Sequence, residues 1–398
     1  MLSTSGPSAH SVYIHIPFCR KRCSYCDFNT YAGITSLLPV YVNALCQEIV
    51  KVTSANSTAI PVHTVFLGGG TPSLLTAHQM EAILRTVDDC FDLTENAEIS
   101  IEANPGTIVD DRLKDFRRLG VNRISFGIQS SNYKELNLLG RIHTHEDTVK
   151  SIRAARNARF DNINLDLIFN LPGQTEVQWK NNLQFALALD PEHLSLYSLT
   201  IEEGTLLNQQ IEEGLYEYPD DDNAATMMQI AIDTLKEAGY VHYEISNWAK
   251  PGYECRHNKQ YWKNLPYFGF GAGAHGLVND IRTINEMLPG KYIDRCKKNA
   301  AEQYPVGPAV TEFHLREPEE QIEDHMILNL RLLQEGVNLE NFQSRYNNKV
   351  EDFYPHQVAT LIDSGHLEWC NHGKNLRIPS EHFFIANQIL VNFIRDQD

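Results

Sequence analysis

The sequence predicts an α/β protein in which six strand–helix units form a partial (β/α)6 barrel, followed by a smaller helical domain. Three observations predict it: strand-like and helix-like segments alternate up to about residue 205, polar motifs follow several strands, and the pattern then changes. Alternation of this kind indicates a parallel sheet with crossover helices. Right-handed crossovers curl such a sheet toward a barrel.

The predicted strands are short β-rich runs. They cover residues 12–16, 63–67, 98–102, 123–128, 163–168 and 193–199. Helix-like stretches lie between them, at 38–50, 77–90, 110–119, 145–157 and 176–189. Active sites of α/β barrels lie at the carboxyl ends of the strands. We therefore expect the segments that follow these strands to carry the chemistry.

Beyond residue 205 the alternation stops. A helix is expected over 220–239 with Asp222 as its N-cap, then a strand over 243–248, then a loop-rich stretch to about residue 310. The remainder resembles a winged-helix module. Its helices and hairpin are expected at 318–333, 338–346, 350–364, 366–370 with 375–378, and 380–394. The predicted domains are a barrel core over 1–205, a barrel extension over 206–310 and a winged-helix-like domain over 311–398.

Three cysteines lie close together after the first predicted strand, as Cys19-x3-Cys23-x2-Cys26. Three thiolates on one loop can hold three corners of a cubane 4Fe–4S cluster and leave one iron open to a chelating ligand. A structural zinc site requires four ligands, and no nearby Cys or His pair completes such a site. A disulfide framework is not expected in a large chain with eight scattered cysteines. The motif therefore predicts an iron–sulfur cluster.

Composition argues against several classes of function. The formal net charge is −17, which disfavours nucleic-acid binding through phosphate contacts. The sequence has no run of about 18 apolar residues that could span a bilayer. The first ten residues lack the apolar core of a secretion signal, so we expect a cytoplasmic protein. Arg20, Lys21 and Arg22 inside the cysteine loop either attract an anionic cluster or substrate or form a solvated loop tip.

Further polar residues lie in or after the other predicted strands: Glu102 ends the third strand, Gln129 follows the fourth and Asp166 lies within the fifth. A Gly-Gly-Gly-Thr-Pro segment at 68–72 lets the backbone approach a ligand closely. Glu102 and Asp166 are carboxylates that can each accept two donors, as ribose hydroxyls require. Arg141 can pair bidentately with a carboxylate, and Gln129 can both donate and accept. Each residue alone can also be a salt bridge or cap at the barrel rim, but together they would face one mouth.

The cysteine spacing resembles the radical S-adenosylmethionine (radical SAM) superfamily, in which SAM binds the open iron. The first 200 residues are similar to the oxygen-independent coproporphyrinogen III dehydrogenase family. The matching motifs lie at 13–19, 68–72, 101–105, 125–130, 139–141, 164–168 and 171–175. The resemblance implies that the three cysteines hold the cluster. It also implies a SAM site formed by Tyr13, Tyr25, Gly69, Gly70, Thr71, Glu102, Gln129, Arg141 and Asp166.

Three features indicate the heme chaperone branch of this family, HemW. Phe28 stands where the dehydrogenase has a further cysteine, and the N-terminal arm is shorter. His257 begins a His-Asn-x-x-Tyr-Trp motif similar to that of the heme chaperones. The resemblance implies a protein that binds heme, a 4Fe–4S cluster and SAM and passes heme to apo-hemoproteins such as respiratory cytochromes. It also implies contact with membrane-bound clients and is compatible with a homodimer.

The role of the histidine motif stays open at this point. A His nitrogen can ligate heme iron, and Tyr261 and Trp262 offer flat apolar surfaces to a porphyrin. His275 and Cys255 are alternative ligands, and the motif can instead be a packed, hydrogen-bonded loop. The alternative function is the dehydrogenase reaction, in which a SAM-derived radical starts decarboxylation of coproporphyrinogen III. A different radical SAM enzyme would leave the histidine motif unaccounted for.

Overall fold

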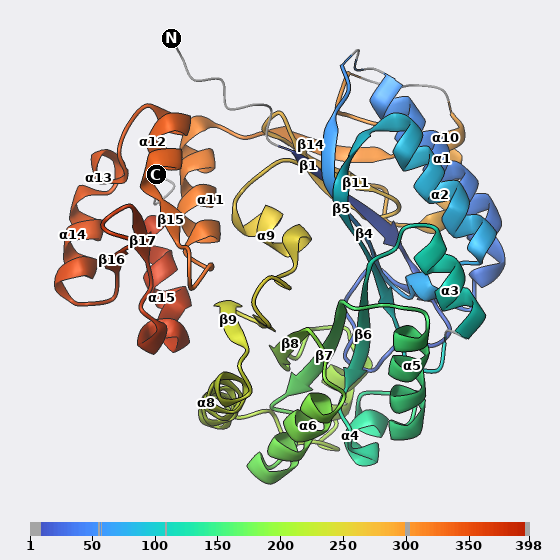
Figure 1. The fold of residues 1–398 in the computed structure, drawn as a ribbon, viewed down its shortest axis with the longest axis horizontal. Coiled ribbons are helices and arrows are strands. Elements are labelled where there is room, and N and C mark those ends of the chain that lie inside the picture. Colours follow the sequence, from blue (N-terminus) through green and yellow to red (C-terminus); the bar gives the residue numbers. More distant parts are fainter. Residues whose placement is uncertain (1–8, 55, 57, 108–109, 299–302, 395–398) are drawn as a thin grey trace. The chain divides into compact units, whose positions relative to one another are not determined.

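The computed structural model describes residues 9–54, 56, 58–107, 110–298 and 303–394 (Figure 1). The chain divides into two compact units. Unit 1 contains Met1–Thr234 and Pro266–His314, and unit 2 contains Leu235–Leu265 and Leu315–Asp398. No helix within the described residues is both long enough and apolar enough to cross a membrane. The three domains inferred from the sequence stay a prediction.

Unit 1 is built on a parallel sheet, as predicted. Its six central strands follow one another in order: β1 (His10–Ile16), β4 (Pro61–Gly69), β5 (Asp92–Ala103), β6 (Arg123–Gln129), β7 (Ile163–Phe169) and β8 (His193–Ser198). Each neighbouring pair is parallel. All seven residues of β6 are buried, as expected for a strand covered on both faces.

The predicted crossover helices are confirmed and lie along the outer side of this sheet (Figure 1). They are α1 (Leu38–Ser54), α2 (Ala77–Cys90), α3 (Asp110–Arg118), α5 (His145–Asn157) and α6 (Glu176–Ala188). A short helix that the sequence analysis missed, α4 (Tyr133–Leu138), follows β6. Capping boxes fix the starts of α2, α5 and α6, where Thr76, Thr144 and Thr175 each exchange hydrogen bonds with the third helical residue.

The prediction of a loop-rich stretch up to about residue 310 was wrong. The segment contains β11 (Tyr267–Phe270), β12 (His275–Val278), β13 (Ile281–Asn285) and α10 (Pro289–Lys297). β11 pairs in parallel with β1, and β12 and β13 continue the sheet as antiparallel strands to the edge strand β14 (Val310–Leu315). These strands are too short, and too rich in Gly and Asn, to give a clear alternating pattern.

One buried carboxylate ties this extension to the barrel. Glu48 of α1 is 1% exposed and accepts hydrogen bonds from the Gly271 N–H at 2.9 Å, the Asn285 side-chain amide at 2.7 Å and the Tyr292 hydroxyl at 2.5 Å. Burial raises the pKa of Glu48 to about 7. Attachment of the extension to α1 therefore requires a side chain at position 48 that accepts hydrogen bonds.

Helix α8 (Asp221–Glu237) lies within the predicted range 220–239, but its N-cap differs from the predicted one. The side chain of Asp220 accepts a hydrogen bond from the Asp222 N–H at 3.3 Å, so Asp220 caps the helix and Asp222 lies in its first turn. A further short helix, α7 (Leu206–Glu212), precedes it. The expected N-cap was therefore displaced by two residues within a run of three aspartates.

Unit 2 contains the predicted helical region with a small sheet. Its helices are α9 (Arg256–Trp262), α11 (Pro318–Asn329), α12 (Leu339–Tyr346), α13 (Val350–Phe353), α14 (Pro355–Asp363) and α15 (Ala386–Leu390). The expected helix over 350–364 is broken because Pro355 starts a new helix. The predicted hairpin is confirmed as β16 (Glu368–Cys370) and β17 (Asn375–Arg377), joined by β15 (Val337–Asn338). The strand expected over 243–248 is two short antiparallel strands, β9 (Val241–Glu244) and β10 (Asn247–Ala249).

Candidate functional site

The cysteine loop of unit 1 is fixed against the end of α4. The Ser24 N–H donates to the Leu139 carbonyl at 3.0 Å, and its hydroxyl donates to the Leu138 carbonyl at 2.6 Å. Gly140 has a φ of +70°, and a Cβ there would lie 2.9 Å from Ser24 Oγ. Glycine is therefore required at this turn for both conformation and space. These contacts hold the loop rigidly between Cys23 and Cys26.

A cavity of about 370 Å³ opens beside this loop at the carboxyl ends of the strands. Its lining includes every predicted cluster and SAM residue except Tyr13 and Thr71. Those that line it are Cys19, Cys23, Tyr25, Cys26, Gly69, Gly70, Glu102, Gln129, Arg141 and Asp166. Residues 140 positions apart along the chain thus meet in one space, as the barrel topology predicts. Phe28 also lines the cavity and is 63% exposed.

Tyr13 does not line this cavity. Its hydroxyl donates to His15 Nδ1 at 2.9 Å, and His15 Nε2 then donates to the Asn29 carbonyl at 2.9 Å. Because the carbonyl can only accept, the proton of the His15 ring belongs on Nε2. Tyr13 therefore supports the cavity from within the sheet and does not line it. His15 likewise points to Asn29, as expected for a residue outside the cluster ligands.

The three thiols have surroundings that suit cluster ligands. All three are free of disulfide bonds. The Thr71 hydroxyl lies 3.6 Å from Cys19 Sγ, and Arg141 Nη1 donates to Cys23 Sγ at 3.3 Å. Burial raises the pKa of the Cys19 thiol, so its thiolate is stabilised by such donors or by iron. A cubane places each thiolate on a different iron, and the donor set fits a 4Fe–4S cluster with one open iron.

Two carboxylates lie deep in the same cavity. Glu102 accepts the Gly69 N–H at 3.0 Å, and burial together with the nearby Asp166 raises the pKa of Glu102 to about 7. Asp166 accepts from the Ser125 hydroxyl at 2.9 Å and from the Asn164 amide at 2.7 Å, and burial raises its pKa as well. Buried acids of this kind are typical of functional sites. Glu102 is the freer of the two to accept hydrogen bonds from a ligand.

Gln129 has two features that favour a bound ligand. It lies at the end of β6 with a φ of +61°, a conformation uncommon for a residue with a side chain. Its side-chain oxygen is buried and receives no hydrogen bond from any described residue. An unsatisfied acceptor in a polar cavity costs free energy unless a ligand or water supplies the donor. The amino group or ribose of SAM can supply it, so the lining fits SAM.

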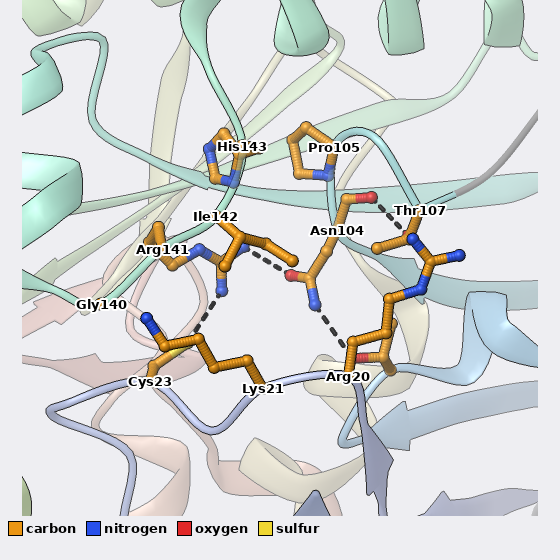
Figure 2. A pocket seen from close by; sticks show the side chains of 11 residues that line it. Arg20, Lys21, Cys23, Asn104, Pro105, Thr107, Gly140, Arg141, Ile142 and His143 are labelled. Carbon is orange, nitrogen blue, oxygen red and sulfur yellow. Dashed lines mark hydrogen bonds between the residues drawn. The ribbon is translucent and has the colours of Figure 1, made fainter. Parts of the chain in front are cut away.

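A second, smaller cavity of about 20 Å³ adjoins the first and shares Lys21, Cys23, Asn104 and Arg141 with it. Its lining has Arg20 and Lys21 at one side and no carboxylate (Figure 2). Burial and Arg141 lower the pKa of His143 to about 4, so its ring is neutral at physiological pH. Arg20 and Lys21 are exposed, as in a solvated loop tip, and both also border this cavity, where they can meet an anionic group.

The histidine motif lies in unit 2, on α9. His257 is 1% exposed, and its Nε2 lies 2.8 Å from the Tyr261 hydroxyl. The Arg331 guanidinium lies over the Trp262 ring, with its Cζ 5.0 Å from the ring centroid. In this arrangement the motif is packed and hydrogen-bonded. Iron coordination through His257 Nε2 requires that the contact with Tyr261 opens.

The two alternative iron ligands differ in accessibility. Cys255 is fully buried, with its N–H donating to the Tyr243 hydroxyl at 3.2 Å. His275 lies on β12 of unit 1 and is exposed. His275 could therefore bind iron without any rearrangement of the structure. The resemblance of the motif to that of heme chaperones favours His257 as the ligand.

Comparison with known proteins agrees with these features. Residues 13–186 match the model of the radical SAM superfamily. The heme chaperone HemW of Bacillus subtilis is 38% identical over 356 residues, which cover 89% of this chain and 92% of that protein. The chain belongs to the HemW heme chaperone family. HemW of Lactococcus lactis is 34% identical over 97% of this chain and 98% of its own length, and HemW of Escherichia coli is 38% identical over 79% and 84%.

A solved structure confirms the fold. The coproporphyrinogen III oxidase HemN from Escherichia coli, described as a radical SAM enzyme, superimposes with a TM-score of 0.82. The match covers 97% of this chain and 90% of HemN at 22% identity. The predicted α/β fold with a helical C-terminal region is therefore correct. Membership of the radical SAM superfamily also implies a 4Fe–4S cluster and SAM.

Proposed function

We propose that the protein is a heme chaperone that binds heme and transfers it to apo-hemoproteins. The observation that carries the proposal is the similarity to HemW proteins along nearly the whole chain, including unit 2 with the His257 motif. The similarity to the HemN structure concerns the fold, and at 22% identity it does not favour the enzyme reaction.

The resident groups of the proposed chaperone lie in unit 1. Cys19, Cys23 and Cys26 would hold the 4Fe–4S cluster, which supplies an open iron for SAM. Around it, Glu102 and Gln129 would accept hydrogen bonds from SAM. The remaining predicted SAM contacts are Tyr25, Gly69, Gly70, Arg141 and Asp166, while Tyr13 and Thr71 would support the site from outside the larger cavity.

Heme itself is the cargo. His257 would supply an axial nitrogen, with Tyr261 and Trp262 of the same motif against the porphyrin. The Tyr261 hydroxyl lies 2.8 Å from His257 Nε2, so heme iron must compete with this contact for the nitrogen. Such competition makes the axial bond weak, as a protein that must release its cargo requires. The expected recipients are apo-hemoproteins such as respiratory cytochromes, including membrane-bound ones.

Three further expectations belong to the same proposal. The protein would act in the cytoplasm, would contact membrane-bound clients, and would form a homodimer. Size-exclusion chromatography with light scattering, with and without the reconstituted cluster, measures the last of these directly. A mass that stays that of a monomer in both samples contradicts the dimer without affecting heme binding.

The test of heme binding is an anaerobic hemin titration of cluster-reconstituted protein, followed by Soret absorbance. We expect saturable one-to-one binding that weakens in His257→Ala and is unchanged in His275→Ala. Tyr261→Phe removes the competing hydroxyl and should tighten binding. A loss confined to His275→Ala would move the ligand to β12. Absence of saturable binding, with conversion of coproporphyrinogen III to protoporphyrinogen IX in the presence of SAM and reductant, would replace the chaperone by the dehydrogenase.

A further inference from the structure

Asn104 lies between the cluster loop and the strand ends and has no role in the site described so far. It follows β5 directly, and its backbone carbonyl accepts from the Thr107 hydroxyl at 2.6 Å and from the Thr107 N–H at 3.1 Å. Gly127 of the neighbouring strand β6 leaves room for its side chain, since a Cβ at 127 would lie 3.4 Å from Asn104 Oδ1. The residue is thus held in one position between two strand ends.

The side chain of Asn104 connects two residues that each contact a different cluster thiol. Its Nδ2 donates to Thr71 Oγ1 at 2.9 Å, and its Oδ1 accepts from Arg141 Nη2 at 2.5 Å (Figure 2). The Thr71 hydroxyl in turn lies 3.6 Å from Cys19 Sγ, and Arg141 Nη1 lies 3.3 Å from Cys23 Sγ. One amide therefore sits behind both thiol contacts.

The direction of these hydrogen bonds follows from the donors. A guanidinium can only donate, so the oxygen of the Asn104 amide must face Arg141. The NH2 group must then face Thr71, whose oxygen becomes an acceptor. The only hydrogen of the Thr71 hydroxyl is left to point at Cys19 Sγ. An amide at position 104 thus fixes not only the place of Thr71 but also which way its hydroxyl donates.

Hydrogen bonds to the sulfurs are among the factors that set the reduction potential of an iron–sulfur cluster. A donor stabilises the extra negative charge of the reduced cluster and therefore raises the potential. We propose that Asn104 is a positioning residue that raises the reduction potential of the cluster by directing the Thr71 hydroxyl at Cys19. The contact between Arg141 and Cys23 depends less on Asn104, because Arg141 also donates to the Gly127 carbonyl at 2.5 Å. The proposal concerns the cluster alone and stands or falls independently of heme binding.

The test is an EPR-monitored reductive titration of reconstituted, SAM-free protein. We expect a lower midpoint potential in Asn104→Leu and in Thr71→Val, and a potential like that of the unmodified protein in Thr71→Ser, which keeps the hydroxyl. Because Asn104 acts through Thr71, the double variant should shift by less than the sum of the two single shifts. Asn208→Leu, on α7 of the same unit, is the matched control because Asn208 lines neither cavity.

A second variant guards against a folding defect in Asn104→Leu. Asn104→Asp has nearly the same shape and still accepts from Arg141, but it can no longer donate to Thr71, whose hydrogen turns from Cys19 to the new carboxylate. Its potential should fall, and the fall should shrink when Thr71 is already Val. Unchanged potentials in Asn104→Leu and Asn104→Asp, or shifts that are fully additive with Thr71→Val, would overturn the proposal.

Discussion

The buried Glu48 makes the stability of unit 1 depend on pH in a defined direction. Burial raises the pKa of Glu48 from 4.5 to about 7, although three groups donate hydrogen bonds to it. In the unfolded chain the carboxyl has its ordinary pKa. Between these two values the unfolded state loses its proton while the folded state keeps it, so a rise in pH favours unfolding. Above pH 7 both states are ionised and the penalty is constant.

The magnitude follows from the size of the shift. Each pKa unit corresponds to about 1.4 kcal/mol, so the shift from 4.5 to about 7 corresponds to roughly 3 kcal/mol of lost stability between pH 4.5 and 7. At about 2 °C per kcal/mol for a unit of this size, the loss amounts to roughly 6 °C in the midpoint of thermal unfolding. In Glu48→Gln this component is absent, so the midpoint should depend less steeply on pH.

The assay compares unfolding midpoints at pH 5 and pH 8, by circular dichroism, in apoprotein of the parent and of Glu48→Gln. Other buried acids contribute equally to both proteins and cancel in the difference. Glu95→Gln, an exposed residue of β5, is the control for loss of a surface charge and should keep the parent pH dependence. Equal pH dependence in the parent and in Glu48→Gln would refute the argument that a buried proton on Glu48 is released on unfolding.

Two further predictions concern the cavity and the cysteine loop. SAM affinity, measured by calorimetry, should rise about fivefold from pH 6 to 7 as Glu102 ionises, since its pKa is about 7 and its carboxylate is the acceptor. An equally pH-dependent Glu102→Gln would contradict this. Gly140→Ala should lower the free energy of unfolding by about 2 kcal/mol, because its Cβ would lie 2.9 Å from Ser24 Oγ at a positive φ. The variant should also retain less iron. Gly173→Ala, also at positive φ but with nothing within 4 Å, should cost less; equal losses would mean that the contact with Ser24 is irrelevant.

The parts of the fold that the sequence predicted correctly share a physical origin. Strands β4 to β8 are apolar runs bounded by turns, and three of their helices start with Thr-based capping boxes. Such signals are local and can be read from a few residues. Strands β11 to β13 could not be read in this way. They are held by pairing with β1 and by the hydrogen bonds of Glu48, which are contacts with residues more than 200 positions away.

The candidate site shows the same division. The cysteines, the glycines and the carboxylates were identified because they lie in or directly after predicted strands, and the topology then brings them into one cavity. Tyr13 is absent from the cavity lining and its hydroxyl donates to His15, and its contact with SAM stays a prediction. The proposed role of Asn104 was missed because its side-chain partners, Thr71 and Arg141, lie on two other segments, although its position after β5 was a usable signal.

The measurement that tests the central claim most directly is heme transfer. Protein loaded with one equivalent of hemin would be incubated with an apo-hemoprotein that is kept separate, either behind a size-selective membrane or bound to a resin. The heme content of each protein would be measured over time. The account predicts that heme moves to the apo-hemoprotein faster from the parent protein than from an equal load on serum albumin. It also predicts that His257→Ala delivers less heme. Heme that stays on the protein while the apo-hemoprotein remains empty would contradict it.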